Sequence, residues 1–490
     1  MRKKLSILLL ISLLLNLSAC GGEIKETTGQ TETESETLAE TEKVYSVALP
    51  DYEGYTFTFL NQEDTLWSWT NHILDYEEIT GNNLSDAVYN RNRTVEEGCN
   101  IRFEVIKGSL GQTNDMRKMM NQAIAADEDI YDVIYTSLFF GGATSFDGLS
   151  TINLYDVESL QLDKEWWNQS FIQSATIGTD KLYTTIDYIN LMGYSSCNIL
   201  FFSKDHCGNN NLEYPYDLVS SGNWTYDEMF AMISVVNNIG TQVNWDPNPD
   251  GNAVYGFVGS HQEAIISLLS GCGTRLINKN EEGIPTINTN ILPMVDAYDA
   301  ILNSFSMDGY CMLINEPSPP SGKGQGPEYF MRGNALFTHD KLGSSCSSVY
   351  RECDVNYGIL PMPKADAAQD TYHSLISEKA FGLNIPVTAS DAERTGTVMD
   401  YLAYVSYYDV IPVLQENLCY KGVSSAVDIE MMDIILETQF VDIGIIYGWT
   451  TNFLNDVCGN KVIQGNNTFS SSWVSHEKKV QSSIDKLFND

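Results

Sequence analysis

The sequence predicts an α/β protein with at least two lobes. Strand-like and helix-like patterns alternate from residue 55 to residue 135 in the order β-α-β-α-β, which is typical of a parallel sheet with right-handed crossovers. About 440 residues follow the N-terminal leader and linker described below, and single hydrophobic cores stop growing near 250–300 residues. The hydrophobic content of 43% is ordinary for a globular protein.

The first 19 residues have the pattern of an export signal. Arg2, Lys3 and Lys4 precede an apolar run of 13 residues, 5–17. A membrane-spanning helix needs about 20 apolar residues, so this run suits a signal-peptide core better than a transmembrane anchor. The run ends in the sequence LSAC at residues 17–20, which resembles the processing site of bacterial lipoproteins. The resemblance implies that Cys20 carries the lipid and becomes the first residue of the mature chain.

A linker is expected between the lipid and the folded part. Residues 21–43 (GGEIKETTGQTETESETLAETEK) are rich in Glu, Thr and Gly and contain almost no apolar side chains. Such a segment cannot bury enough surface to offset the entropy cost of ordering it. We therefore expect residues 20–49 to form a flexible acidic tether and folded structure to begin near Pro50.

Composition excludes some partners. The formal charge is −37, and loss of the three basic residues of the leader would leave 65 acidic against 25 basic residues, or −40. This charge repels nucleic acid but does not oppose a neutral ligand. Nine cysteines besides Cys20 are scattered without a CxxC pair, which is a poor disulfide or zinc framework, although one or two bridges remain open.

The first strand-helix units are defined by hydrophobic periodicity. The expected strands are 55–60, 101–106 and 130–135, and the expected helices are 84–97, with Ser85 as its N-cap and Gly98 as its stop, and 113–126. Ligands in such sheets collect outside the carboxyl ends of the strands, so the loops after Leu60 and Tyr135 are the first candidate sites.

Later helices are marked by their start signals. Thr225 and Glu228 fit a capping box for a helix that Gly240 would end. Ser390 and Glu393 predict a helix through Val405, and Val480, Ile484 and Leu487 give the spacing of a final helix.

Five segments in order resemble the extracellular solute-binding proteins of bacterial ABC importers, family 1, the sugar-binding type. They are NILFFSKDHC (198–207), GNWTYDEMFAM (222–232), MRGNALFTHD (331–340), YGILPMPK (357–364) and FGLNIPVTASDAERTGTVMDYLAYV (381–405). Ser203 stands where the family usually has Asn. The resemblance covers most of residues 50–460 and identifies a family, not a ligand.

The resemblance implies the two-lobed periplasmic-binding-protein-like fold of type II, with a hinge between the lobes. It places hinge crossings near 186–198 and 366–376, lobe 1 at 50–188 plus 374–420, and lobe 2 at 189–372 plus 421–490. The implied function is capture of a neutral solute, with a carbohydrate or oligosaccharide favoured, for delivery to ABC permease subunits from the outer face of the cytoplasmic membrane. A peptide or another organic solute remains open, and no cofactor and no catalysis are expected.

Aromatic and acidic residues give the candidate ligand contacts of lobe 1. Sugars present hydroxyls and apolar faces, and Tyr and Trp offer a flat ring with a polar handle. The loop after the first strand contains Glu63, Asp64, Trp67 and Trp69, although these Trp side chains could instead pack on the following helix. Further candidates from lobe 1 are Ser137 after the third strand and Asp187 beside the expected hinge, which could instead form a turn.

Three candidates come from lobe 2. Asp340 follows the strand ALFTH, and Tyr447 and Trp449 lie in IIYGWTTNF, where either ring could stack on a sugar or pack in the core. We expect the pair Trp166–Trp167 and Trp224 to be structural.

Other chemistries find weak support. The loop 246–251 has oxygen donors at the first positions of a calcium loop but Phe257 where Glu is needed, so a turn is favoured and no metal site is expected. A surface glycoside hydrolase remains an alternative because paired carboxylates cannot be singled out among 65 acidic residues. A surface adhesin without transport is the third alternative.

Overall fold

The structure, a computed structural model, describes residues 45–61, 74, 77–108, 113–138, 150–236, 253–305, 311–314, 326–418, 425–463 and 467–489. The signal segment, Cys20 and almost all of the linker lie outside these residues. Val47 and the residues after it belong to one compact unit. Within the described part, no helix combines the length and the apolar character that crossing a bilayer requires.

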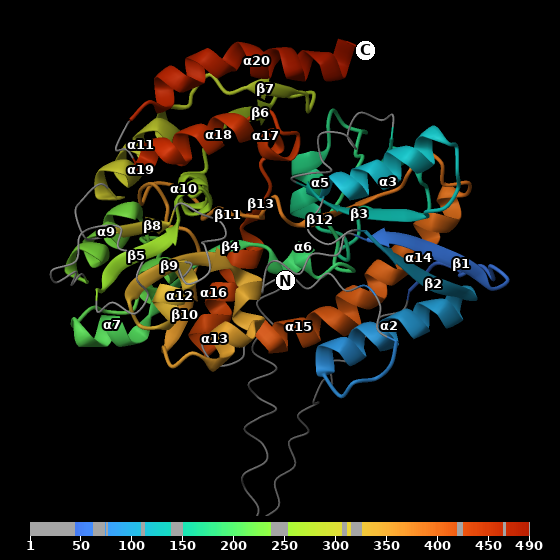
Figure 1. Cartoon of the computed structure of the whole chain (residues 1–490), viewed down its shortest axis with the longest axis horizontal. Helices are drawn as coiled ribbons and strands as arrows, with labels where there is room; N and C mark the ends of the chain where they lie inside the picture. Colours follow the sequence, from blue (N-terminus) through green and yellow to red (C-terminus); the bar gives the residue numbers. More distant parts are fainter. Residues whose placement is uncertain are drawn as a thin grey trace, which may run out of the picture. The chain divides into compact units, whose positions relative to one another are not determined.

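A four-stranded sheet contains the predicted β-α-β-α-β unit (Figure 1). Its spatial order is β12 (Phe381–Asn384), β3 (Val133–Ser137), β1 (Tyr55–Asn61) and β2 (Ile101–Lys107). The strands β1, β2 and β3 are parallel, as the sequence predicts, and β12 is antiparallel to β3. Phe57 and Phe59 of β1 lie on one face of the sheet and Leu60 on the other, and all three side chains are buried.

Helices cover both faces of this sheet. Figure 1 shows α3 (Thr113–Ala125) on one side and α2 (Asn83–Cys99) with α14 (Ala392–Val405) on the other. Leu60 and Ile134 pack with Met120 and Ala123 of α3. On the opposite face Phe57, Phe59 and Phe103 form a cluster of ring contacts, with centroids 5.1–5.9 Å apart. The two cores together exclude water from the sheet.

A five-stranded mixed sheet forms the second core. Its spatial order is β10 (Tyr357–Leu360), β4 (Asn198–Ser203), β9 (Ala335–Lys341), β5 (Tyr255–Ser260) and β8 (Cys311–Ile314). The strands β5, β8 and β9 are parallel, and β4 is antiparallel to both β9 and β10. The helices α9 (Tyr226–Val235), α10 (His261–Ser270) and α12 (Gly326–Met331) contact β5.

The chain passes between the two sheets through paired extended segments. It passes from β3 to β4, returns from β10 to β12, and contains the short parallel pair β11 (Ser374–Leu375) and β13 (Gln439–Phe440). Cys197 and Ile376 form an isolated antiparallel β-bridge through their backbones, and the Ile376 amide donates to the Phe440 carbonyl at 2.8 Å. Three stretches that are distant in sequence therefore run side by side between the sheets.

A further layer follows the second sheet. It contains the antiparallel pair β6 (Ile277–Lys279) and β7 (Pro285–Ile287), which α20 (Phe469–Asn489) contacts. Val480 and Ile484 of α20 are buried, as their spacing predicts. The remaining α-helices of four or more residues in the described part are α5 (Gln169–Ala175), α6 (Met192–Ser195), α7 (Lys204–Asn209), α8 (Tyr216–Ser220), α11 (Leu292–Phe305), α13 (Ser348–Glu352), α15 (Ile411–Leu418), α16 (Ala426–Glu437), α17 (Ile443–Ile446), α18 (Thr451–Cys458) and α19 (Asn460–Ile463).

Two predicted helix caps are wrong by a few residues. The N-cap of α2 is Asn82, not Ser85, because the Asn82 carboxamide oxygen accepts from two backbone amides of the first turn. The N-cap of α14 is Asp391, not Ser390, and Asp391 accepts from the Arg394 amide at 2.9 Å. Thr225 caps α9 as predicted, but this helix ends at Val235, so Gly240 is not its stop.

The tryptophans expected to be structural are buried. Trp167 and Trp224 are 1% and 0% exposed, and Trp166 is also buried. Both indole N–H groups of the pair Trp166–Trp167 donate to Asp400, at 3.0 and 2.9 Å. Eight cysteines of the described residues are free thiols.

Candidate functional site

The carboxyl end of β3 and the residues just before β4 meet at one segment of the chain, residues 376–380. At the end of β3, the Ser137 hydroxyl donates to the Glu378 carbonyl at 3.2 Å, and the Leu138 amide donates to the Ala380 carbonyl at 2.9 Å. On the other side of the segment, the Ser377 amide donates to the Ser196 carbonyl at 3.1 Å. Ligands of open α/β sheets bind outside the carboxyl ends of strands, so this region is the first candidate site.

A cluster of three charged side chains connects this segment to the second sheet. Lys341, the last residue of β9, lies 3.1 Å from Glu263 in the first turn of α10. Lys379 also forms an ion pair with Glu263. Burial alone would raise the pKa of Glu263, but the two ammonium groups outweigh it and hold this pKa well below its ordinary value. Glu263 is therefore ionised at neutral pH and ties residues 377–380 to α10.

The two aromatic candidates of the C-terminal part form one stack. The rings of Tyr447 and Trp449 lie 4.7 Å apart at an interplanar angle of 19°. Gly448 between them has φ of +68°, a left-handed conformation that a glycine adopts without a steric penalty. Burial raises the pKa of Tyr447, and the nearby Tyr183 adds to the rise. Tyr447 is buried while Trp449 is half-buried, so the Trp ring is the more accessible one.

Ser137 and Asp187 are both fully buried in the structure. The carboxylate of Asp187 accepts from the Tyr135 hydroxyl at 2.5 Å and from the amides of Ile189 and Asn190 at 3.0 and 2.9 Å. Burial raises the pKa of Asp187 to about 6 in spite of these hydrogen bonds. In this geometry Asp187 holds the turn that leads to α6, and its contact with a solute stays a prediction.

Asp340 lies near the end of β9, beside the charged cluster. Its carboxylate accepts from the Lys341 amide at 2.8 Å and from the Tyr350 hydroxyl at 3.1 Å. Burial raises the pKa of Asp340 although Lys341 opposes the rise. Asp340 therefore lies beside the charged cluster and is held by hydrogen bonds within the protein.

The other four candidates, Glu63, Asp64, Trp67 and Trp69, lie outside the described residues.

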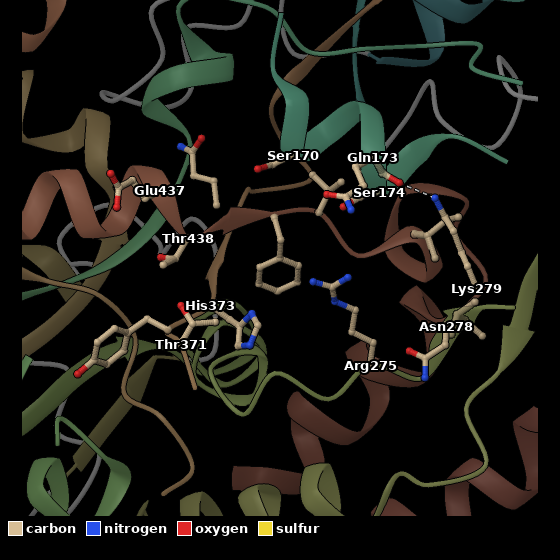
Figure 2. A pocket seen from close by; sticks show the side chains of 16 residues that line it. Ser170, Gln173, Ser174, Arg275, Asn278, Lys279, Thr371, His373, Glu437 and Thr438 are labelled. Carbon is tan, nitrogen blue, oxygen red and sulfur yellow. Dashed lines mark hydrogen bonds between the residues drawn. The ribbon is translucent and has the colours of Figure 1, made fainter. Parts of the chain in front are cut away.

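A separate cavity of about 480 Å³ lies beside the amino end of β11 and along β13 (Figure 2). Residues 371–373 and 437–438 lead into these two strands, whereas residues 376–380 follow β11. The cavity therefore lies at the opposite end of β11 from the charged cluster. Its walls come from α5, β6 and both extended segments: Ser170, Gln173, Ser174, Arg275, Ile277, Asn278, Lys279, Thr371, Tyr372, His373, Glu437, Thr438, Gln439, Phe440, Val441 and Ile443.

The cavity has two cationic side chains on one wall. The Arg275 guanidinium lies over the Phe440 ring, 4.3 Å from its centroid, and Lys279 donates to the Gln173 carbonyl at 2.6 Å. Burial and the charge of Arg275 lower the pKa of Lys279 to about 8. The same two causes lower the pKa of His373 to about 4, so this imidazole is neutral at pH 7.

Sequence reasoning missed the charged residues of both the cluster at residues 376–380 and the separate cavity. Glu263, Lys341 and Lys379 carry no motif; Lys341 is marked only by its place at the end of the strand ALFTHDK, and the other two residues have no such signal. Arg275 also lacks a motif. In the described residues no group of three or more His, Cys, Asp or Glu side chains is placed to hold a metal ion. The loop 246–251 lies outside the described residues.

The architecture has known relatives among solved structures. The galacto-N-biose-/lacto-N-biose I-binding protein of a Bifidobacterium longum ABC transporter, in complex with lacto-N-biose, has a TM-score of 0.57 at 11% identity, covering 89% of this chain and 98% of that one. UgpB from Mycobacterium tuberculosis, in complex with glycerophosphocholine, has a TM-score of 0.55 at 13% identity, covering 89% and 99%. An ABC substrate-binding protein of Listeria monocytogenes, in complex with cycloalternan, has a TM-score of 0.53 at 14% identity, covering 89% and 98%.

These likenesses show the fold. The chain has the α/β periplasmic-binding-protein-like fold of type II solute-binding proteins, over 89% of its length. This confirms the predicted fold class. No protein-family model matches the chain, and no curated protein is similar to it in sequence.

Proposed function

We propose that this protein is the solute-binding subunit of an ABC importer and that it captures a neutral solute, preferably a carbohydrate, between two lobes. The observation that carries the proposal is the shared fold with solute-binding proteins across nearly their whole length. The permease subunits would be its protein partners. A lipid on Cys20 and the acidic linker would hold the protein at the outer face of the cytoplasmic membrane.

The proposed lobes are residues 50–188 plus 374–420, and 189–372 plus 421–490. The extended segments that run between the two sheets are consistent with hinge crossings near 186–198 and 366–376. Closure about such crossings would bring the carboxyl ends of both sheets towards a solute. Segment 376–380 contacts β3 and is joined to α10 by the ion pair of Lys379 with Glu263, so its contacts would change as the lobes close.

The proposed solute contacts include the half-buried ring of Trp449. A flat ring stacked on Tyr447 is held in a fixed orientation, which suits stacking on the apolar face of a sugar. The charged side chains Lys341, Glu263 and Lys379 offer groups that hydroxyls can hydrogen-bond. Glu263 pairs with both lysines, and Asp340 and Glu378 also act on Lys341, so acidic groups of the protein already offset the two positive charges and a neutral solute fits this site better than an ion.

A thermal-shift screen over neutral mono- and oligosaccharides tests the proposal. Ligand at 100-fold over Kd stabilises a protein by about 2.7 kcal/mol. An unfolding entropy of about 2.1 cal/mol/K per residue gives about 0.9 kcal/mol/K for roughly 440 residues. We therefore expect a melting temperature about 3 °C higher with the correct sugar.

Two variants and one product assay make the screen specific. Trp449→Ala should weaken binding of the sugar by about tenfold, whereas Tyr214→Ala, which removes an exposed ring elsewhere, should bind like the parent. Equal binding by parent and Trp449→Ala would refute the assignment of this ring. Chromatography of the sugar after incubation should show no shorter products, and their appearance would favour the hydrolase alternative.

A further inference from the structure

The cavity beside the amino end of β11 and along β13 contains a guanidinium group for which the described residues supply no acceptor. Among the described residues, no hydrogen bond and no ion pair is found for the side chain of Arg275, and its Nε atom is buried without a partner. An arginine presents five N–H donors in a planar fork, so leaving them unpaired in a partly buried place is unfavourable. Its charge lies over the Phe440 ring, and Asp442 also acts on it.

The surroundings of Arg275 hold this fork in place. Phe440 lies under the guanidinium, and the His373 ring meets Phe440 edge-on, with centroids 5.6 Å apart. Asp442 influences the charge of Arg275, but its Oδ1 atom already accepts from the amides of Gly444 and Ile445. Figure 2 shows Arg275 pointing into the middle of the cavity, with Lys279 on the same side and Glu437 at the far side.

The other polar side chains of the cavity match hydroxyl groups. Ser170 and Ser174 from α5, Asn278 from β6 and Thr438 before β13 face the same space as Arg275. Hydroxyls and carboxamides both donate and accept hydrogen bonds, as the hydroxyls of a polyol require. The volume of about 480 Å³ falls within the usual range of small-molecule sites and is far larger than an inorganic ion needs.

We propose that this cavity is a second binding site, distinct from the carboxyl-edge site, and that it takes a small hydroxylated carboxylate such as a sugar acid. The carboxylate would lie against the Arg275 fork in the bidentate arrangement that arginine favours, with Lys279 adding positive charge. The hydroxyls would bond to the Ser, Asn and Thr side chains. Because α5 follows the first sheet and β6 belongs to the layer on the second, the bound acid would bridge elements from both.

Calorimetric titration of the full chain with sodium D-galacturonate tests this proposal. D-galactose is the matched neutral probe, since it has the same ring hydroxyls without the carboxylate. Buffer and ionic strength are kept constant and free of other carboxylates, because the net charge of −37 makes anion binding sensitive to salt. We expect galacturonate to bind at least about tenfold more tightly than galactose, in line with a charge-assisted bidentate contact.

Three variants locate the site. Arg275→Gln should bind galacturonate about tenfold more weakly than the parent, or weaker still. Arg102→Gln, which makes the same charge change on the exposed side of β2, should bind galacturonate like the parent. Ser174→Leu should narrow the cavity from the α5 side without changing Arg275, and should also weaken galacturonate binding. This variant replaces Arg275→Gln as the test if Arg275→Gln does not fold.

The outcomes separate this site from the proposed solute site. The proposal is overturned if the parent does not bind galacturonate at millimolar concentration, if galactose binds equally well to Trp449→Ala, or if Ser174→Leu and folded Arg275→Gln bind galacturonate like the parent. Galactose binding that Trp449→Ala loses and Arg275→Gln keeps belongs to the proposed solute site and does not count against this cavity.

Discussion

Replacing Asp187 by Asn should remove a pH dependence that burial builds into the protein. Burial raises the pKa of Asp187 from 3.8 to about 6. Each pKa unit corresponds to about 1.4 kcal/mol, so this rise corresponds to about 3 kcal/mol. Since Asp187 is 0% exposed, solvent screening does not reduce this figure substantially.

The sign follows from which state holds the proton. Between about pH 4 and pH 6 the folded protein keeps the proton of Asp187 while the unfolded chain has released it. The free energy of unfolding should therefore fall by about 3 kcal/mol as the pH rises through this window. An Asn side chain can still accept from the Ile189 and Asn190 amides and can donate to the Tyr135 hydroxyl, so the hydrogen bonds survive.

Urea unfolding of parent and variant at pH 4 and pH 7 measures this difference. We expect the two proteins to have similar stability at pH 4, and Asp187→Asn to be more stable than the parent at pH 7 by up to about 3 kcal/mol. Asp163→Asn, at a side chain that is 79% exposed, is the control and should show no such change. A variant that loses stability at pH 7 would show that the ionised carboxylate, not the hydrogen-bonded turn, is what the fold requires.

Four further predictions concern other parts of the chain. Glu263→Gln should destabilise the fold by about 2–3 kcal/mol, because Lys341 loses its countercharge. The cost is lower than for a fully buried ion pair, since Glu263 is 29% exposed. Glu282→Gln on the surface is the control in urea unfolding. Because the folded pKa of Glu263 lies below its ordinary value of 4.5, the contribution of this group should be complete above that pH and disappear as the pH falls below it, and acid unfolding of the parent that matches Glu263→Gln would contradict this. Asp400→Ala should cost about 3–5 kcal/mol, since it leaves the indole N–H groups of Trp166 and Trp167 and the Gln161 amide without an acceptor, whereas Asp400→Asn should cost much less; equal melting temperatures for the two variants would refute this role. Cys20→Ala should release the protein from the membrane fraction into the medium, as immunoblotting of cell fractions would show, and retention of the variant would refute the lipid anchor.

The local part of the fold could be predicted from sequence. The strands β1 and β2 and the helices α2 and α3 lie within one or two residues of their expected bounds, because alternating and helical periodicities are local signals. The caps of α2 and α14 were misplaced because several Ser, Asn and Asp residues compete at each start. The backbone conformation, which no local pattern reveals, decides among them.

The connections between the sheets could not be derived from periodicity. The strands β11 and β13 have two residues each, too few for any pattern, and they pair across 65 residues of sequence. The two-lobed fold was predicted from the resemblance to a known family, not from periodicity. It depends on five ordered segments, four of which carry buried strands: β4 in 198–207, β9 except Lys341 in 331–340, β10 in 357–364 and β12 in 381–405.

The candidate sites depend on contacts between distant residues. Glu263 meets Lys341 and Lys379 across 78 and 116 residues, and Arg275 meets Phe440 across an even longer stretch of sequence. Neither cluster has a spacing rule that a sequence could display. By contrast, the stack of Tyr447 and Trp449 comes from a local turn at Gly448, and sequence reasoning did single out both rings.

Small-angle X-ray scattering with and without a saturating sugar, taken from the thermal-shift screen, tests the central claim most directly. If the protein closes around its solute, the radius of gyration should decrease on binding, and Trp449→Ala should show no decrease at a sugar concentration that saturates only the parent. A bound sugar that leaves the scattering curve of the parent unchanged would contradict capture by closure of two lobes.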